Sequence, residues 1–192
     1  MSLQAPVFCY IVVMHHFLPT GQSLVIRTPE LDEAGALMHC LQQMTRESDF
    51  LLHTPEEALG MDISGERDFI KSYRDQPQHL LLVAVVDGFI VGYLTVTQGR
   101  FYKQMHSGEM GIAILRNYWN LGIGRRLMTT MVRWAEEHPT IEIVHFQVFA
   151  HNEKAIQLYR NFNFQECGRL PGAIRQKDGR RIDLITMYKN VK

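Results

Sequence analysis

The sequence has few cysteines and no long apolar run. Cys9, Cys40 and Cys167 lie far apart and form no CxxC or Cys/His ligand pattern, so we expect reduced thiols and a cytoplasmic location. The apolar stretch 7–14 is much shorter than the roughly 20 residues that span a bilayer and lacks the flanks of a signal peptide. Neither a disulfide framework nor a membrane anchor is therefore expected.

The chain also has no net charge, since 20 Lys and Arg balance 20 Asp and Glu. Proteins that bind nucleic acid or anionic membranes depend on a strong positive excess. We therefore expect neither partner. The nine histidines are scattered without carboxylates at ligand spacing, so no metal site is predicted.

The first residues carry no charge, because no Asp, Glu, Lys or Arg precedes Arg27. We divide the chain into an uncharged arm, residues 1–22, and one domain, residues 23–192, since 192 residues suit a single core. The arm is expected to form an extra strand or a packing segment. It would either cover a sheet edge within one chain or cross to a second copy in a homodimer.

The hydrophobic pattern predicts an α/β protein of the α+β type. The region 29–73 has helical periodicity and is broken at Pro55, which predicts two helices. Two β-rich runs around Asp87-Gly88 predict a hairpin. Further strands are expected at 106–115, 141–149, 164–169 and 181–188, with helices from 124 to 138 and from 152 to 163. This order predicts a single-domain, mixed, mostly antiparallel sheet with helices on both faces.

One loop has the features of an anion site. Residues 112–126 read IAILRNYWNLGIGRR, so a strand leads through Gly-Ile-Gly into a helix. Glycines allow close approach of a ligand, and the free amides of a helix start bind anions. Neither the GxGxxG fingerprint nor the GK[ST] of a nucleotide-binding P-loop is present. Taken alone, the glycines could serve only a tight turn.

A second stretch, residues 152–164, reads NEKAIQLYRNFNF. Together the two stretches resemble the GNAT superfamily of acetyl-CoA-dependent N-acetyltransferases. The family's Q/R-x-x-G-x-G/A motif aligns on residues 119–124, and N-x-x-A-x-x-L-Y-x-x-x-G-F aligns on residues 152–164. Trp119 replaces the usual Gln or Arg and loses a side-chain contact to phosphate. Asn163 replaces the usual Gly, so we predict a left-handed backbone there.

The resemblance implies a GNAT-like fold with a splayed cofactor cleft, where the strand from Ile141 separates from its neighbour. Residues 23–192 would form the N-acetyltransferase domain. Acetyl-CoA would be the acyl donor, with its pyrophosphate on the amides of residues 121–125 and its pantetheine along residues 112–114. The implied cofactor-binding residues are Ile112, Ala113, Ile114, Trp119, Asn120, Leu121, Gly122, Ile123, Gly124, Arg125 and Asn152.

The resemblance also implies direct attack of an amine on the thioester. Tyr159 matches the family's general acid, although it could equally be a buried core tyrosine. Glu109 is the first candidate for the general base and His106 the second, and either could act through water or merely face solvent. A backbone amide of residues 112–114 would stabilise the oxyanion. Asn152 could contact the cofactor or only cap its helix.

The charge distribution bears on the acceptor. Residues 27–70 contain ten acidic and three basic side chains, whereas residues 71–192 contain ten acidic and seventeen basic side chains. Such acids are usually a solvated helix face, but in this family the early helices border the acceptor site. The sharper hypothesis is a cationic acceptor: a polyamine, an aminoglycoside, or a peptide lysine or N-terminus. The alternative function is a non-catalytic acyl-CoA sensor.

Overall fold

A computed structural model describes residues 14–192, which fold around one eight-stranded sheet. Its order is β1-β2-β3-β4-β5-β6-β8-β7, and among the described strands only β5 and β6 pair in parallel. The predicted mixed, mostly antiparallel sheet is therefore confirmed. The strands are β1 Met14–Phe17, β2 Ser23–Arg27, β3 Leu80–Val86, β4 Phe89–Gln98, β5 Ser107–Ile114, β6 Ile143–Phe149, β7 Gln165–Arg175 and β8 Arg181–Asn190.

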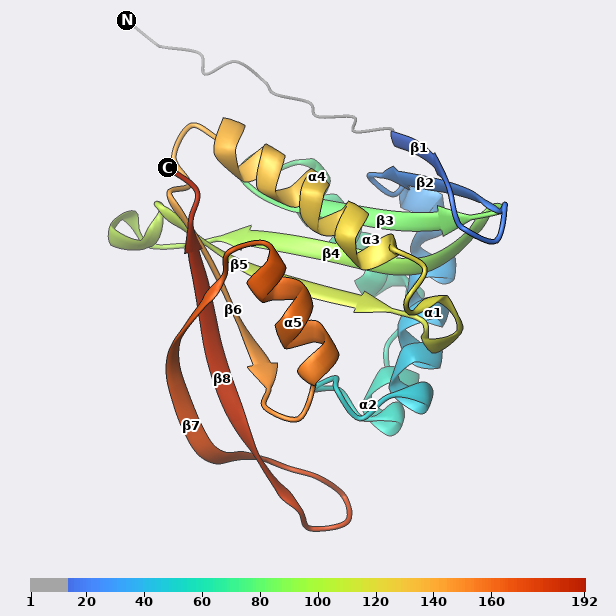
Figure 1. The fold of residues 1–192 in the computed structure, drawn as a ribbon. Coiled ribbons are helices and arrows are strands. Elements are labelled where there is room, and N and C mark those ends of the chain that lie inside the picture. The colour runs from blue at the N-terminus through green and yellow to red at the C-terminus, as the bar shows by residue number, and fades with distance from the viewer. Residues whose placement is uncertain (1–13) are drawn as a thin grey trace, which may run out of the picture.

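Helices cover both faces of this sheet, as expected. Helices α1 to α3 lie on one face, and α4 and α5 lie on the other (Figure 1). Within residues 14–192, no helix has both the length and the apolar character needed to cross a bilayer. The helices are α1 Ala34–Glu47, α2 Pro55–Leu59, α3 Ile63–Arg74, α4 Ile123–Glu137 and α5 Glu153–Asn161, with short 3-10 turns at Leu31–Glu33, Tyr102–Gln104 and Arg116–Tyr118.

The first third contains three α-helices, so the prediction of two is wrong. Helix α2 begins as predicted at Pro55, where Thr54 and Glu57 form a capping box. It ends after five residues at Gly60. The Asp62 side chain then accepts a hydrogen bond from the Gly65 amide (2.8 Å) and starts α3. The second cap was overlooked because the apolar periodicity continues across it.

The described part of the arm forms the edge strand β1. It pairs antiparallel with β2 through a turn in which Gly21 has a φ of 85°. Residues 1–13, which include Cys9 and nearly all of the stretch 7–14, lie outside the described residues. The predicted extra strand is present over Met14–Phe17, while the crossing to a second copy stays a prediction.

The hydrophobic core lies where β3 and β4 meet the helices. All seven residues of β3 are buried, and α4 buries a stripe towards the sheet that includes Leu127, Met131 and Trp134. The predicted hairpin turn has positive φ at both Asp87 (48°) and Gly88 (89°), as the twist of a two-residue connection requires. The Asp87 carboxylate also accepts a hydrogen bond from the Ser23 amide (3.1 Å), which ties this turn to β2.

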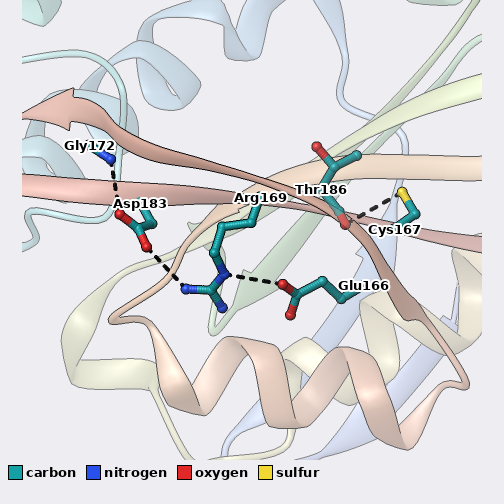
Figure 2. Close-up of polar contacts among 6 residues, drawn as sticks. All are labelled: Glu166, Cys167, Arg169, Gly172, Asp183 and Thr186. Atoms are coloured by element: carbon teal, nitrogen blue, oxygen red, sulfur yellow. Dashed lines mark hydrogen bonds and ion pairs between the residues drawn. The ribbon is translucent and has the colours of Figure 1, made fainter.

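Strands β7 and β8 form a long hairpin at the other end of the sheet (Figure 1). Arg169 donates to Glu166 (3.2 Å) and Asp183 (3.3 Å), and Asp183 accepts from the Gly172 amide (2.9 Å), where the strand register is irregular (Figure 2). At its tip, Lys177 pairs with Glu56 of α2 (2.5 Å). The hairpin therefore borders the α1–α2 region, and β7 extends beyond the predicted residues 164–169.

Candidate active site

Strands β5 and β6 stay together over only three residue pairs. Ser107–Glu109 pairs with Ile143–His145, and beyond these residues β5 pairs only with β4 and β6 only with β8. The two strands then diverge (Figure 1). We call this opening the fork. It lies where the sequence predicted that the strand from Ile141 would separate from its neighbour.

The backbone of β5 supplies unpaired polar groups to the fork. The Ser107 carbonyl accepts from Gly99 and the Leu115 amide donates to Val91, so odd-numbered residues between them point their backbone groups at β4. Ile112 and Ile114 consequently point theirs into the fork. Ala113 points its backbone towards β4, which narrows the predicted backbone contacts to Ile112 and Ile114.

Trp119 occupies one of these backbone groups. Its indole nitrogen donates to the Ile114 carbonyl (2.7 Å), and its ring lies near Phe50 and under the Arg116 guanidinium. The tryptophan that replaces the family's Gln or Arg therefore closes the end of β5. The groups left for a ligand are the amide of Ile114 and both backbone groups of Ile112.

The loop after β5 ends in an open helix start. Asn120 (φ 63°) and Gly122 (φ 84°) both have left-handed backbones, and Gly122 caps α4 without any side-chain hydrogen bond. The first amides of α4 therefore have no partner within the helix. A Cβ at Gly124 would lie 3.1 Å from Leu158 and 3.5 Å from Ile114. Glycine there lets α4, α5 and β5 converge on the fork.

Positive charge surrounds this helix start. Arg125 and Arg126 lie in the first turn of α4, where cations are unfavourable unless an anion is close. Neither forms an ion pair with any residue of the range 14–192. Arg126 instead donates to the His16 ring (2.7 Å), and partial burial together with the Arg126 charge lowers the pKa of His16.

These residues line a groove of about 630 Å³ between β1 and α4. Sequence reasoning missed the contribution of β1, since nothing local to His16 indicates a contact with a helix more than a hundred residues away. The groove continues from the loop that holds the free amides. Its lining residues are Met14, His16, Phe17, Leu18, Pro19, Asn120, Leu121, Gly122, Arg125, Arg126, Thr129 and Thr130.

Tyr159 borders the fork on the face covered by α5. Its ring packs against Phe146, the first residue of β6 after the last pair with β5 (4.3 Å between ring centroids). Tyr159 is only 7% exposed. Burial raises the pKa of the Tyr159 hydroxyl, which makes no hydrogen bond with another described residue. Tyr159 is therefore both a buried core residue and a neighbour of the fork.

Asn152 caps α5 at a 3.3 Å contact from the Ala155 amide to its side-chain oxygen. Its amide nitrogen stays available as a donor.

Asn163 has a φ of 64°, which confirms the predicted left-handed backbone. Within the described residues, no three His, Cys, Asp or Glu side chains gather as a metal site would require.

The opposite face of the fork carries titratable groups. Glu109 lies in register with Thr97 on β4 and with His145 on β6, and adjacent residues of neighbouring strands face the same way. Tyr73 of α3 contacts the Thr97 hydroxyl (2.6 Å), so this is the face covered by α1 to α3. Glu109 and His145 are the last pair before the strands separate.

Of the two candidate bases, Glu109 lies at the fork and His106 lies three residues earlier, where its carbonyl accepts from Glu142 and Ile143. Sequence reasoning overlooked His145. Strand alternation could have found it, since Val144 and Phe146 face the core and His145 must face the other way.

Most of this candidate site lies in the part of the chain that matches one known protein family. Residues 42–164 match the model of the Acetyltransferase (GNAT) family. L-amino acid N-acetyltransferase AaaT of Escherichia coli K12 is 29% identical over 91 residues, which make up 47% of this chain and 56% of that protein. The chain thus spans little more than half the length of this relative.

Solved structures share the fold. An acetyltransferase of the GNAT family from Streptococcus pneumoniae superposes with a TM-score of 0.83 at 24% identity, covering 88% of this chain and 99% of that one. The Salmonella typhimurium protein yncA, solved with its cofactor acetyl-CoA, superposes with a TM-score of 0.77 at 16% identity, covering 88% and 94%.

The unpaired cation at the start of α4 leads to a test of anion binding. In Arg125→Gln, we expect the free energy of unfolding of the unliganded protein to stay the same or rise by about 0.3–1 kcal/mol, because a cation leaves a helix N-terminus. The affinity for acetyl-CoA should fall about tenfold, since a charged hydrogen bond to phosphate is lost. Thermal shifts with and without acetyl-CoA measure both effects.

Arg133→Gln is the matched control for this variant. Arg133 lies on the same helix beyond its first turn and pairs with Glu137, so the thermal shift caused by acetyl-CoA should match that of the wild type. Equal acetyl-CoA shifts in Arg125→Gln and the wild type would show that Arg125 holds no phosphate.

Proposed function

The chain belongs to the GNAT family of acetyltransferases, and on this premise we propose that it transfers an acetyl group from acetyl-CoA to a cationic primary amine. The observation that carries the proposal is the fork. Unpaired backbone groups of Ile112 and Ile114 lead from it directly to the free amides of α4. An extended chain that ends in a pyrophosphate matches this sequence of binding groups.

The residues present fit such a ligand. The amides of residues 121–125 would hold the pyrophosphate, with Arg125 beside them. The backbone amide of Ile114 would pair with the pantetheine as a further strand does, and the Asn152 amide would donate to it. Acetyl-CoA supplies an acetyl group activated as a thioester.

Glu109 prepares the acceptor. An amine with a pKa of about 10.4 is protonated at neutral pH and must lose a proton before it can attack a carbonyl. Glu109 is exposed at the fork on the face of α1 to α3, where it accepts this proton directly or through water. His145 lies beside it in register and offers a second proton acceptor.

The amide of Ile112, which lies nearer to Glu109 than that of Ile114, points into the fork from the edge of β5. There it can donate a hydrogen bond to the carbonyl oxygen as negative charge develops during attack. A donor held in place by the sheet needs no reorganisation, which is why such amides stabilise transition states. The carbon–nitrogen bond would form first and the carbon–sulfur bond would break next, while the nitrogen releases its second proton to solvent.

Tyr159 supplies the proton for the departing sulfur. Burial keeps its hydroxyl protonated, because it raises the pKa of the phenol. Burial also raises the pKa of a thiol at the same place, so the sulfur takes the proton rather than leaving as a thiolate. Glu109 and Tyr159 thus act from opposite faces of the sheet.

The acceptor side supports a cationic substrate. Seven net negative charges lie within residues 27–70, which include α1, α2 and most of α3 on the face that carries Glu109. The relative from Escherichia coli is named for acetylation of L-amino acids, whose α-amine is cationic at neutral pH. An amine that keeps a further positive charge fits this environment best.

A panel of amines tests the proposed activity. We expect thiol release from acetyl-CoA with diamines, polyamines and basic peptides, and slower release with neutral hydroxylated amines. Raising the salt concentration from 0.01 M to 1 M should lower kcat/KM for the cationic amines, because screening shortens from about 30 Å to 3 Å. Binding of acetyl-CoA without thiol release from any amine would favour the sensor function instead.

Replacing the proposed acid separates binding from chemistry. We expect Tyr159→Phe to keep the affinity for acetyl-CoA and to lower kcat by about 10²–10⁴, the usual contribution of a general acid. Calorimetric titration and thiol-release assays across pH measure the two quantities. Unchanged turnover at every pH would mean that Tyr159 is only a core residue.

The two candidate bases can be distinguished by matched amide substitutions. We expect Glu109→Gln to lower kcat/KM about 10²-fold or more, while His106→Gln stays close to the wild type. Steady-state assays below and above the pKa of the amine measure this, because an already deprotonated amine needs no base. A larger loss in His106→Gln would transfer the role to His106.

A further inference from the structure

Glu66 is a buried carboxylate that the proposed mechanism does not use. It lies on α3 and is only 5% exposed. Within residues 14–192 its side chain forms no hydrogen bond and no ion pair. Every side-chain oxygen or nitrogen in this range that is fully shielded from solvent has a hydrogen-bond partner. Because the Glu66 carboxylate has none, its oxygens must keep some contact with solvent despite the low exposure of the residue.

The fold places this carboxylate on the acceptor face. Seven residues after Glu66, and therefore on the same side of α3, Tyr73 contacts Thr97, which lies in register with Glu109. Glu66 lies on the buried side of α3, together with Ile70. In agreement with this position, burial raises the pKa of Tyr93 of β4, and Cys40, Glu66 and Tyr73 add to the effect. Tyr93 is the register partner of Ala113 on β5.

Within residues 14–192, no cation pairs with Glu66. Burial alone accounts for the raised pKa of its carboxyl. The basic residues of α3 lie on its exposed side, and Arg74 pairs there with Glu30 (3.1 Å). Burying an unpaired carboxylate is costly.

Other acids of residues 27–70 have evident structural partners. Glu33 pairs with Arg27 (2.6 Å), Glu57 completes the capping box of Thr54, and Asp62 caps α3. These contacts stabilise helix starts and the β2–α1 connection. Glu66 differs because it is buried on the sheet side of α3 and its side chain makes no such contact within residues 14–192.

We propose that Glu66 binds a second, non-reacting cationic group of the acceptor and so selects amines that carry two positive charges. This inference rests on the proposed acetyltransferase function. The reacting nitrogen must lose its proton beside Glu109 at the fork, whereas Glu66 lies two helical turns before Tyr73, the residue of α3 that contacts the Thr97 neighbour of Glu109. The charge that reaches Glu66 therefore belongs to another group of the same molecule, such as the distal ammonium of a diamine.

The unpaired carboxylate also has a signature in stability. Burial raises the pKa of Glu66 in the folded protein, so the folded state binds more protons than the unfolded state and stability falls as pH rises through this pKa. Glu66→Gln removes the charge at constant shape. We expect it to raise the free energy of unfolding at pH 7–8, with the gain shrinking as the pH falls towards about 3, where the carboxyl is protonated in both states.

Calorimetric titration tests the binding role without requiring turnover. The probes are 1,4-diaminobutane and 1-aminobutane, added to the wild type, Glu66→Gln and Asp68→Asn in the presence of coenzyme A. Asp68 is exposed on the outer side of the same helix, so its substitution removes an equal charge at a different place. We expect the diamine to bind the wild type and Asp68→Asn with similar affinity, and Glu66→Gln about tenfold or more weakly.

Three results would overturn the inference: equal diamine affinity in Glu66→Gln and the wild type, equal weakening in Asp68→Asn, or no preference of the wild type for the diamine over the monoamine. In thiol-release assays, Glu66→Gln should raise KM for the diamine and leave kcat unchanged. Absence of thiol release in the wild type would reject the acetyltransferase function, while the calorimetric result would still decide the role of Glu66.

Discussion

The separation of β5 from β6 is the constraint on which the rest of the site depends. Strand β4 holds β5 as far as Ile114, and β8 holds all of β6, but only three pairs join the two halves of the sheet. Buried backbone groups must find partners, and Trp119 satisfies just one of those that the fork exposes. The remaining groups form a ready edge for an extended ligand.

The fork also separates two kinds of chemistry. On the face of α4 and α5 lie the first amides of α4, two arginines that form no ion pair within residues 14–192, and the neutral Tyr159. On the face of α1 to α3 lie Glu109, His145 and Glu66. Basic side chains therefore border the opening on one face and carboxylates on the other. The zero net charge of the chain conceals this division, because the acids of residues 27–70 cancel the excess of bases that follows them.

Segments outside the family match complete the site. Residues 42–164 match the GNAT family, yet β1 borders the groove beside α4 through His16. At the other end, the β7–β8 hairpin reaches the α1–α2 region through Lys177 and Glu56. The match contains the fork and the helix start, whereas these two segments border them from outside the matched residues.

Local patterns in the sequence were sufficient for the order of the elements, the Asp87-Gly88 hairpin, the loop of Gly122 and the left-handed Asn163, because turn chemistry and motif spacing act over a few residues. They failed at Asp62, where a cap interrupts a continuing apolar periodicity. Strand register decided that the backbone groups of Ile112, and not those of Ala113, point into the fork, and that Glu109 lies beside His145. Packing between elements decided that His16 contacts Arg126 and that Glu66 is buried without an ion pair within residues 14–192. Each of these contacts joins elements distant in the chain, so no local signal could specify it.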